Sequence, residues 1–109
     1  MRVIDAGHVY ELDDLKSDTK TDFNFHMDPK IHPQGMDGPS CQEVLRMLID
    51  RVEYLDREKF WGRNAEIVQH LRQAILLFEI RALELKVVKG QLAIEDLEVG
   101  PDGHIKLSK

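Results

Sequence analysis

The chain has 109 residues, of which 42% are hydrophobic and 32% charged, and this composition indicates one globular domain with a modest core. The formal net charge of −5 excludes a protein that coats long nucleic acid, since such a protein needs a broad basic face. The single cysteine, Cys41, and the lack of an apolar run near the roughly 18 residues of a membrane span favour solution in a reducing cytosol.

The first 39 residues, 1–39, are expected to form short strands joined by turns, and they carry four basic and eight acidic side chains. The run "HVYEL" predicts one strand. The run "DFNFHM" predicts a second, because Phe23, Phe25 and Met27 alternate on one face. The polar run "DDLKSDTKT" between them predicts a loop. The run "DPKIHPQGMDGPS" that follows has three prolines and two glycines, which predict an ordered loop or a lid.

A helical hairpin is predicted over residues 40–86. Ser40 and Glu43 have capping-box spacing, so the first helix should begin there. The helix should end near Arg57, because the apolar pattern lapses and Gly62 lies just beyond. Its apolar stripe comprises Val44, Leu45, Leu48, Val52 and Leu55.

The second helix is expected to begin at Asn64 as its N-cap, with Glu66 in the first turn, where a carboxylate complements the helix dipole. Its predicted inner stripe comprises Ile67, Val68, Leu71, Ile75, Phe78, Ala82 and Leu85. Apolar residues outside that stripe are Leu76, Leu77, Ile80 and Leu83. One partner helix covers one stripe, so the surplus predicts an oligomer interface.

The last segment, residues 87–109, is expected to be extended again. The runs "AIEDLEV" and "HIKL" flank "GPDG", a strong turn signal, and together they predict a C-terminal β-hairpin. The fold class is therefore α+β: an antiparallel two-helix hairpin with short strands at each end of the chain.

The chain offers no arrangement of residues that predicts catalysis. His26 and His32 have no cysteine or carboxylate cluster at zinc spacing beside them, so both are expected to be exposed loop histidines. Glu95 and Glu98 are three apart, as in the metal-binding helices of pyrophosphohydrolases. The surrounding residues favour a strand, which would put the two carboxylates on opposite faces. No phosphate-binding loop or nucleophile–base pair is present, so we expect a protein that is not an enzyme.

The turn "KFWGRN" between the helices is the strongest candidate for a binding site. Asn64 at a helix start is most simply a cap, yet free amides at such a start also bind anions. Arg63 beside it would add charge-assisted hydrogen bonds to a phosphate. Tyr54, one turn before the first helix ends, should lie close to Asn64 and either stack on a purine or pack at an interface. Phe60 and Trp61 are expected to pack the turn.

Arg81 is a second candidate, because it places a charge inside the apolar run "LLFEIRALEL". It can pair with Glu79 or Glu84, or extend to the surface. Arg81 is 17 residues from Asn64, roughly 25 Å along a helix at 1.5 Å per residue. The two side chains of one subunit therefore cannot grip the same small ligand.

The runs "CQEVLRMLIDRVEYLD" and "RNAEIVQHLRQAILLFEIRA" resemble the helical hairpin of the phage anti-Thoeris sponge proteins, a domain shared with anti-CBASS sponges. The resemblance covers about residues 40–86. It implies a protein that binds a cyclic immune signal intact, so that the immune effector is never activated. The implied ligand is a cyclic ADP-ribose isomer. The implied place of action is the cytoplasm of an infected bacterium, and the implied assembly is a homo-oligomer, either a dimer or a hexamer.

By this resemblance, Tyr54 falls on the family's ligand-stacking aromatic and Asn64 on its ligand-contacting asparagine. Arg81 falls on the arginine of a second site, which in relatives takes cyclic di- or trinucleotides. A further arginine follows one turn later in many relatives, and here Leu85 stands in its place, which weakens the case for a cyclic trinucleotide. A basic residue from the N-terminal region also contacts the ligand in the family, and Lys30 is the candidate here.

The primary hypothesis is therefore a sponge that binds a cyclic ADP-ribose isomer near the hairpin turn, with the loop over residues 28–40 covering the ligand. No cofactor is expected. One alternative is an oligomeric interaction module without a ligand, whose apolar second helix docks a protein through Leu76 and Ile80. Another is a helical pyrophosphohydrolase, which would need inward-facing acidic pairs that the sequence lacks.

Overall fold

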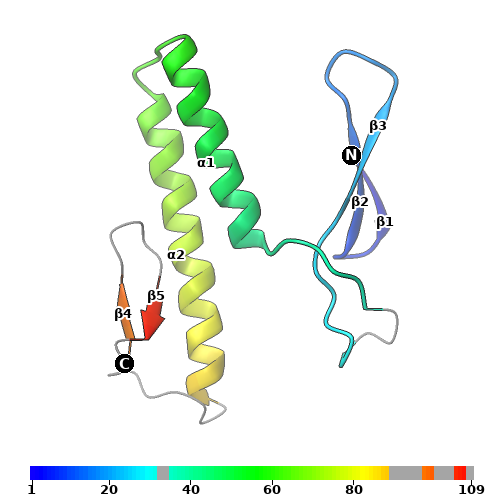
Figure 1. The fold of residues 1–109 in the computed structure, drawn as a ribbon, viewed down its shortest axis with the longest axis vertical. Coiled ribbons are helices and arrows are strands. Elements are labelled where there is room, and N and C mark those ends of the chain that lie inside the picture. Colours follow the sequence, from blue (N-terminus) through cyan, green and yellow to red (C-terminus); the bar gives the residue numbers. More distant parts are fainter. Residues whose placement is uncertain (32–34, 89–96, 100–104, 108–109) are drawn as a thin grey trace. The chain divides into compact units, whose positions relative to one another are not determined.

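The computed structural model describes residues 1–31, 35–88, 97–99 and 105–107 (Figure 1). Within these residues the protein is α+β, which confirms the predicted class. The chain divides into two compact units, Met1–Ser40 and Cys41–Lys109. The first unit is built on a sheet, and the second contains both helices.

The first unit has a three-stranded antiparallel sheet in the order β1-β2-β3. Gly7 makes the turn between the first two strands with a φ of 79°, a left-handed conformation that glycine adopts without steric cost. The register places Tyr10 opposite both Val3 and Phe23, so these three side chains share one face of the sheet. The strands are β1 (Arg2–Asp5), β2 (Val9–Asp13) and β3 (Lys20–Asn24).

The sequence analysis missed one strand and gave wrong bounds for another. β1 was not predicted, because four residues with a charge at each end give too short a pattern. β3 begins at Lys20, inside the predicted polar loop, and ends at Asn24 instead of Met27. The reason is the length of its partner: Asn24 already pairs with Val9, the first residue of β2. Beyond that point the chain bonds elsewhere, with the Met27 amide donating to the Met36 carbonyl at 2.8 Å.

The segment after β3 is an ordered loop in its described parts, residues 25–31 and 35–40. The His26 amide donates to the Pro39 carbonyl at 3.2 Å, and the Asn24 side-chain amide donates to the Asp37 carbonyl at 3.0 Å. Gly38 comes so close to Asn24 that a Cβ would lie 2.6 Å from its carbonyl oxygen. These contacts agree with an ordered loop, while His32 lies outside the described residues.

The second unit is dominated by an antiparallel hairpin of α1 (Cys41–Glu58) and α2 (Asn64–Val88) (Figure 1). Both helix starts are where the sequence predicts them, and α1 ends one residue after the expected Arg57. Since α1 begins at Cys41, Ser40 occupies the N-cap position. The centre of the interface is Ile75, which is 2% exposed, together with the buried Val68.

The outer surface of the hairpin is unusually apolar for a single chain. Leu77 is 66% exposed, and Leu85 and Ile67, which were predicted to face inward, are also exposed. On α1 no residue is fully buried, and the exposed apolar side chains are Met47, Leu48 and Leu55. Two helices alone therefore leave apolar area uncovered on both members of the pair.

Two short strands complete the description: β4 (Leu97–Val99) pairs antiparallel with β5 (Ile105–Leu107). The connection between them, residues 100–104, lies outside the described residues, as does Glu95. The predicted C-terminal β-hairpin therefore stays a prediction.

Candidate functional site

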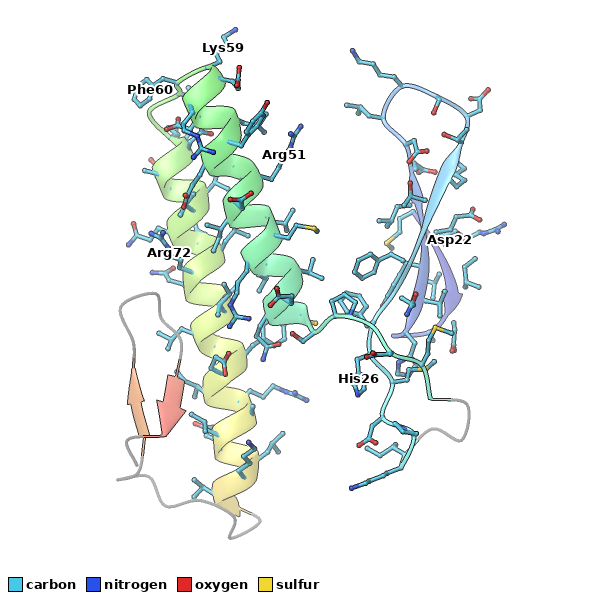
Figure 2. All side chains as sticks on the ribbon, viewed as in Figure 1. Asp22, His26, Arg51, Lys59, Phe60 and Arg72 are labelled. Atoms are coloured by element: carbon cyan, nitrogen blue, oxygen red, sulfur yellow. The ribbon has the colours of Figure 1, made fainter. Side chains whose placement is uncertain are left out.

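The turn between the helices exposes its aromatic side chains. Phe60 is 77% exposed and Trp61 is 53% exposed, so the prediction that they pack the turn was wrong. Figure 2 shows Lys59 and Phe60 projecting from the end of the hairpin. The turn is closed by hydrogen bonds of Trp61 backbone groups instead: the Trp61 amide donates to Asp56 Oδ1 at 3.3 Å, and the Trp61 carbonyl accepts from the Asn64 backbone amide at 2.9 Å.

Asn64 begins α2 but does not cap it. The Arg63 carbonyl accepts the first bonds of the helix, from the amides of Glu66 at 3.0 Å and Ile67 at 3.3 Å. Arg63 is therefore the N-cap residue, and Asn64 lies in the first turn. The Asn64 side chain reaches across to α1 and donates from Nδ2 to Asp56 Oδ1 at 2.8 Å. The predicted start of α2 is confirmed, but the prediction of an Asn64 cap was wrong, because the Arg63 carbonyl accepts the first helical hydrogen bonds.

Tyr54 lies on the outer side of α1 and is 46% exposed. Two residues correspond to about 200° of rotation around a helix, so Tyr54 and Asp56 point about 160° apart. The expectation that the hairpin brings Tyr54 next to Asn64 was therefore wrong within one chain. The Arg51 and Arg57 guanidinium groups lie 5.8 and 6.0 Å from the centroid of the Tyr54 ring, and Arg51 points away from α2 (Figure 2).

Arg63 is close to the start of α2 but already has two partners. It forms an ion pair with Glu66 at 3.3 Å, and its guanidinium lies 6.0 Å from the Trp61 ring centroid. Both members of this i,i+3 ion pair are largely exposed, so the pair contributes at most about 0.5 kcal/mol. An incoming phosphate could replace Glu66 at little cost. The Glu66 and Asp56 carboxylates nevertheless make this helix start less favourable for an anion than the sequence indicates.

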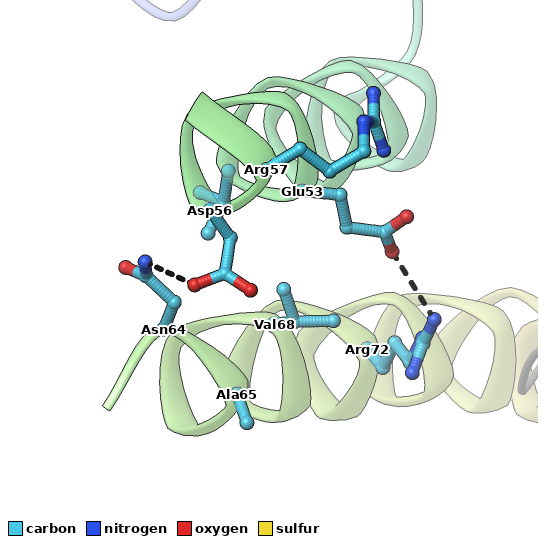
Figure 3. Close-up of a pocket in the computed structure, with 8 residues that line it drawn as sticks. Glu53, Asp56, Arg57, Asn64, Ala65, Val68 and Arg72 are labelled. Carbon is cyan, nitrogen blue, oxygen red and sulfur yellow. Dashed lines mark hydrogen bonds and ion pairs between the residues drawn. The ribbon is translucent and has the colours of Figure 1, made fainter. Parts of the chain in front are cut away.

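A cleft of about 360 Å³ lies between the two helices beside the turn (Figure 3). Its volume is in the range of small-molecule sites. Two hydrogen-bonded links cross it, Asn64 to Asp56 at 2.8 Å and Arg72 to Glu53 at 3.5 Å. The residues that line it are Val52, Glu53, Asp56 and Arg57 from α1, and Asn64, Ala65, Val68 and Arg72 from α2.

The cleft brings together one predicted residue, Asn64, and several that the sequence did not single out. The sequence could have indicated Asp56, Glu53 and Arg72, because residues that face each other in an antiparallel hairpin lie at similar distances from the turn. Opposite charges placed in that way, such as Glu53 and Arg72, are candidates for a link between the helices. Arg57 lines the cleft and also lies over the Tyr54 ring, so it connects the two candidate surfaces.

Of the remaining predicted residues, Lys30 belongs to the other unit, and Arg81 is not among the residues that line the cleft. Lys30 belongs to the first unit, where it is exposed and its backbone amide donates to Asp28 at 2.9 Å. Arg81 is exposed on α2, and within the described residues it forms no ion pair. Glu79, one of its two predicted partners, instead bonds to Arg46 of α1 at 3.3 Å.

Comparisons with known protein families, with curated proteins and with solved structures find no match for this chain. Its function is therefore inferred from its own residues and their geometry. In the described parts of the chain, no helix is long and apolar enough to cross a bilayer. The same parts contain no group of three histidine, cysteine, aspartate or glutamate side chains placed to share a metal ion.

Proposed function

We propose that this protein is a phage counter-defence sponge that binds a cyclic ADP-ribose isomer and holds it intact, so that a Thoeris effector is not activated. The proposal rests on the resemblance of residues 40–86 to the sponge hairpin and on the residues that the hairpin exposes. The protein would act in the cytoplasm of the infected bacterium, without a cofactor and without chemical turnover.

The observation that carries the proposal is the exposed Tyr54 ring between two guanidinium groups, those of Arg51 and Arg57. A half-exposed aromatic ring offers a stacking surface for a purine, and base–aromatic stacking contributes about 1 to 3 kcal/mol. The two guanidinium groups, 5.8 and 6.0 Å from the ring centroid, suit the phosphates that a nucleotide carries next to its base. Arg57 also lines the cleft that contains Asn64, so the Tyr54 surface and the cleft share this arginine.

Tyr54 and Asn64 face different sides of one hairpin, so the site is proposed to form between two copies of the chain. The Tyr54 surface of one copy would hold the purine, and the cleft of another copy would hold the rest of the ligand. The exposed Leu77 and Met47 favour such an assembly, because both lie on uncovered helix faces. The proposed homo-oligomer is a dimer or a hexamer.

The other predicted residues have roles only in this assembly. Arg63 would contact a phosphate after exchanging its Glu66 partner, and Lys30 would reach the ligand from the loop over residues 28–40, which would cover it. Arg81, exposed on α2, would form a second site for cyclic di- or trinucleotides. The C-terminal β-hairpin of residues 87–109 belongs to the same proposed fold.

The proposal is tested by native mass spectrometry of the protein with a cyclic ADP-ribose isomer, followed by heat denaturation and analysis of the released compound. A fixed ligand-to-chain ratio and recovery of intact ligand are expected. Binding without turnover needs only affinity, about −8 to −12 kcal/mol for micromolar to nanomolar dissociation constants. Recovery of a cleaved compound would make the protein an enzyme, and no binding would refute the sponge.

The variant pair Tyr54→Ala and Tyr54→Phe tests the stacking surface. Loss of the ring is expected to weaken binding by about one to two orders of magnitude, and phenylalanine should retain most of it. Circular dichroism should remain unchanged in both variants, because the side chain is exposed. Unchanged affinity of Tyr54→Ala would refute the assignment of Tyr54.

The alternative, an interaction module without a ligand, is favoured by one observation, the exposed apolar side of α2. Leu76 is half-buried, Ile80 is exposed and Leu77 is 66% exposed. Leu77→Glu would place a carboxylate on that side and should reduce the mass of the assembly in light scattering. If the mass falls while ligand binding is absent in every form of the protein, the module is the better description.

A further inference from the structure

The Asp56 carboxylate uses only one of its two oxygens to hold the hairpin together. Oδ1 accepts from the Trp61 amide at 3.3 Å and from Asn64 Nδ2 at 2.8 Å. Oδ2 has no hydrogen-bond partner among the residues that the structure describes. Figure 3 shows this second oxygen directed into the cleft, toward Val68.

A carboxylate oxygen accepts hydrogen bonds and donates none. The Glu53 carboxylate of the same cleft is paired with Arg72 at 3.5 Å, whereas Oδ2 of Asp56 is itself negative and would repel a phosphate placed against it. A hydroxyl group is a suitable partner, because its hydrogen bond to an ionised acceptor is about twice as strong as a neutral one. Although Arg57 and Arg72 also line the cleft, Oδ2 itself therefore fits a hydroxyl of the ligand's sugar better than a phosphate.

We propose that Asp56 recognises a ribose of the bound nucleotide by accepting a hydrogen bond from a ribose hydroxyl at Oδ2. This inference rests on the proposed function and specifies which part of the ligand enters the cleft. The arginines beside the Tyr54 ring are then the phosphate contacts, and the cleft takes the sugar. An aspartate on a ribose hydroxyl is a contact that dinucleotide-binding proteins also use.

Asp56 also positions Asn64. Because the carboxylate can only accept, the Asn64 group that faces it must be the NH₂, which fixes the orientation of the amide. The Asn64 carbonyl oxygen is thereby turned away from Asp56, as Figure 3 shows, and is available as a second acceptor. Asp56 and Asn64 therefore both present acceptor oxygens, so the ligand group that binds them must be a hydrogen-bond donor such as a hydroxyl.

The test measures binding of a cyclic ADP-ribose isomer and of its analogues that each lack one ribose hydroxyl, using titration calorimetry. The variant Asp56→Asn retains Oδ1 for both structural hydrogen bonds and replaces Oδ2 by an NH₂ donor. Asp22→Asn is the matched control, since it makes the same change at an exposed β3 residue that does not line the cleft. Tyr54→Ala is measured in parallel, and thermal melting checks the fold of each variant.

Asp56→Asn is expected to weaken binding about 10- to 100-fold, as for the loss of a hydrogen bond to a charged group, while Asp22→Asn changes it less than about threefold. One deoxy analogue should bind the wild-type protein more weakly than the full ligand by a similar factor. The Asp56→Asn variant should bind that analogue and the full ligand with equal affinity. If Asp56→Asn does not fold, discrimination by the wild-type protein between the ligand and its deoxy analogues is sufficient.

Two negative outcomes are distinct. If Tyr54→Ala loses binding while Asp56→Asn and every deoxy analogue bind normally, Asp56 does not recognise ribose and the sponge proposal stands. If the wild-type protein binds no cyclic ADP-ribose isomer, both proposals are refuted.

Discussion

The sheet unit and the helical hairpin are stabilised by different interactions. In the hairpin, buried apolar residues lie at the centre, and polar links such as Asp56–Asn64 cross between the helices. In the sheet, one face contains the aromatic ring of Tyr10, and the other contains exposed ion pairs such as Asp13–Lys20. In the described part of the sheet unit, the one buried apolar residue is Met27, which lies in the loop after β3.

This difference indicates where ligand binding can arise. The Asp13 carboxylate in the sheet is fully engaged, with one oxygen on Lys20 and the other on the terminal amine of Met1. The Asp56 carboxylate in the hairpin keeps one oxygen free in a cleft. A carboxylate whose two oxygens both bond within the protein has no acceptor left for a ligand. A carboxylate beside a cleft that uses only one oxygen can stabilise the fold and also bind a ligand.

The largest effect is expected from removing the centre of the hairpin. Ile75→Ala should lower the free energy of unfolding by about 2 to 5 kcal/mol, because Ile75 is 2% exposed and its loss leaves a cavity. Urea unfolding followed by the helical circular dichroism signal measures it. Gln73→Ala, exposed on the same helix, is the control and should change stability by less than about 0.5 kcal/mol. Equal effects of the two variants would refute a core centred on Ile75.

A smaller effect is expected in the sheet from Phe25→Ala. The Phe25 ring lies 5.0 Å from the Phe23 centroid and 5.9 Å from that of Tyr10, both edge to face. Loss of two such pairs and of partial burial should cost roughly 1 to 3 kcal/mol. Hydrogen exchange of the β2 amides is the measurement, since it reports on the sheet alone. Leu15→Ala, almost fully exposed, should leave that exchange unchanged; an equal effect would contradict the aromatic cluster.

The helices were predictable because local signals and periodicity agreed. Ser40, the run of apolar positions to Leu55, and the turn residues before Asn64 all pointed to the same boundaries, and both helix starts were correct. β1 was not predictable, since Arg2–Asp5 becomes a strand only through pairing with β2. The end of β3 was set by the length of its partner, which no property of residues 25–27 reveals.

The candidate site was harder to predict than the fold. The sequence selected Asn64 and Tyr54, yet their relative placement depends on which way each side chain turns from its helix. Asp56 was overlooked because an aspartate near a helix end is ordinarily a solvated charge. Its role depends on a turn that brings its Oδ1 to the Trp61 amide and the Asn64 amide, and such a contact is a property of three-dimensional structure.

A third prediction compares a partly buried ion pair and an exposed ion pair within the hairpin. Arg46 bonds to Glu79 across the helices at 3.3 Å, and both side chains are partly buried. A double-mutant cycle with Arg46→Met and Glu79→Gln should give a coupling free energy of about 0.5 to 1.5 kcal/mol. The exposed pair of Arg63 and Glu66 should give at most about 0.5 kcal/mol in the same urea-unfolding experiment. The reverse order would mean that burial does not strengthen the link.

The smallest effect concerns the charged face of the sheet. A hydrogen bond from Lys20, followed by one from the terminal amine, lowers the pKa of Asp13 from 3.8 to about 2. Because the folded-state pKa is depressed, the contribution of Asp13 to stability is present above about pH 4. It is lost as the pH falls through about 2.

Carboxyl chemical shifts of Asp13 in an NMR titration measure this pKa directly. Lys20→Met removes the larger cause of the shift, so the pKa of Asp13 should move up toward 3.8 in that variant. The midpoint of hairpin unfolding should not change, since the hairpin is stabilised by apolar burial around Ile75. An unchanged Asp13 titration in Lys20→Met would show that the ion pairs do not hold this face of the sheet. The contrast between the two units would then rest on the aromatic cluster alone.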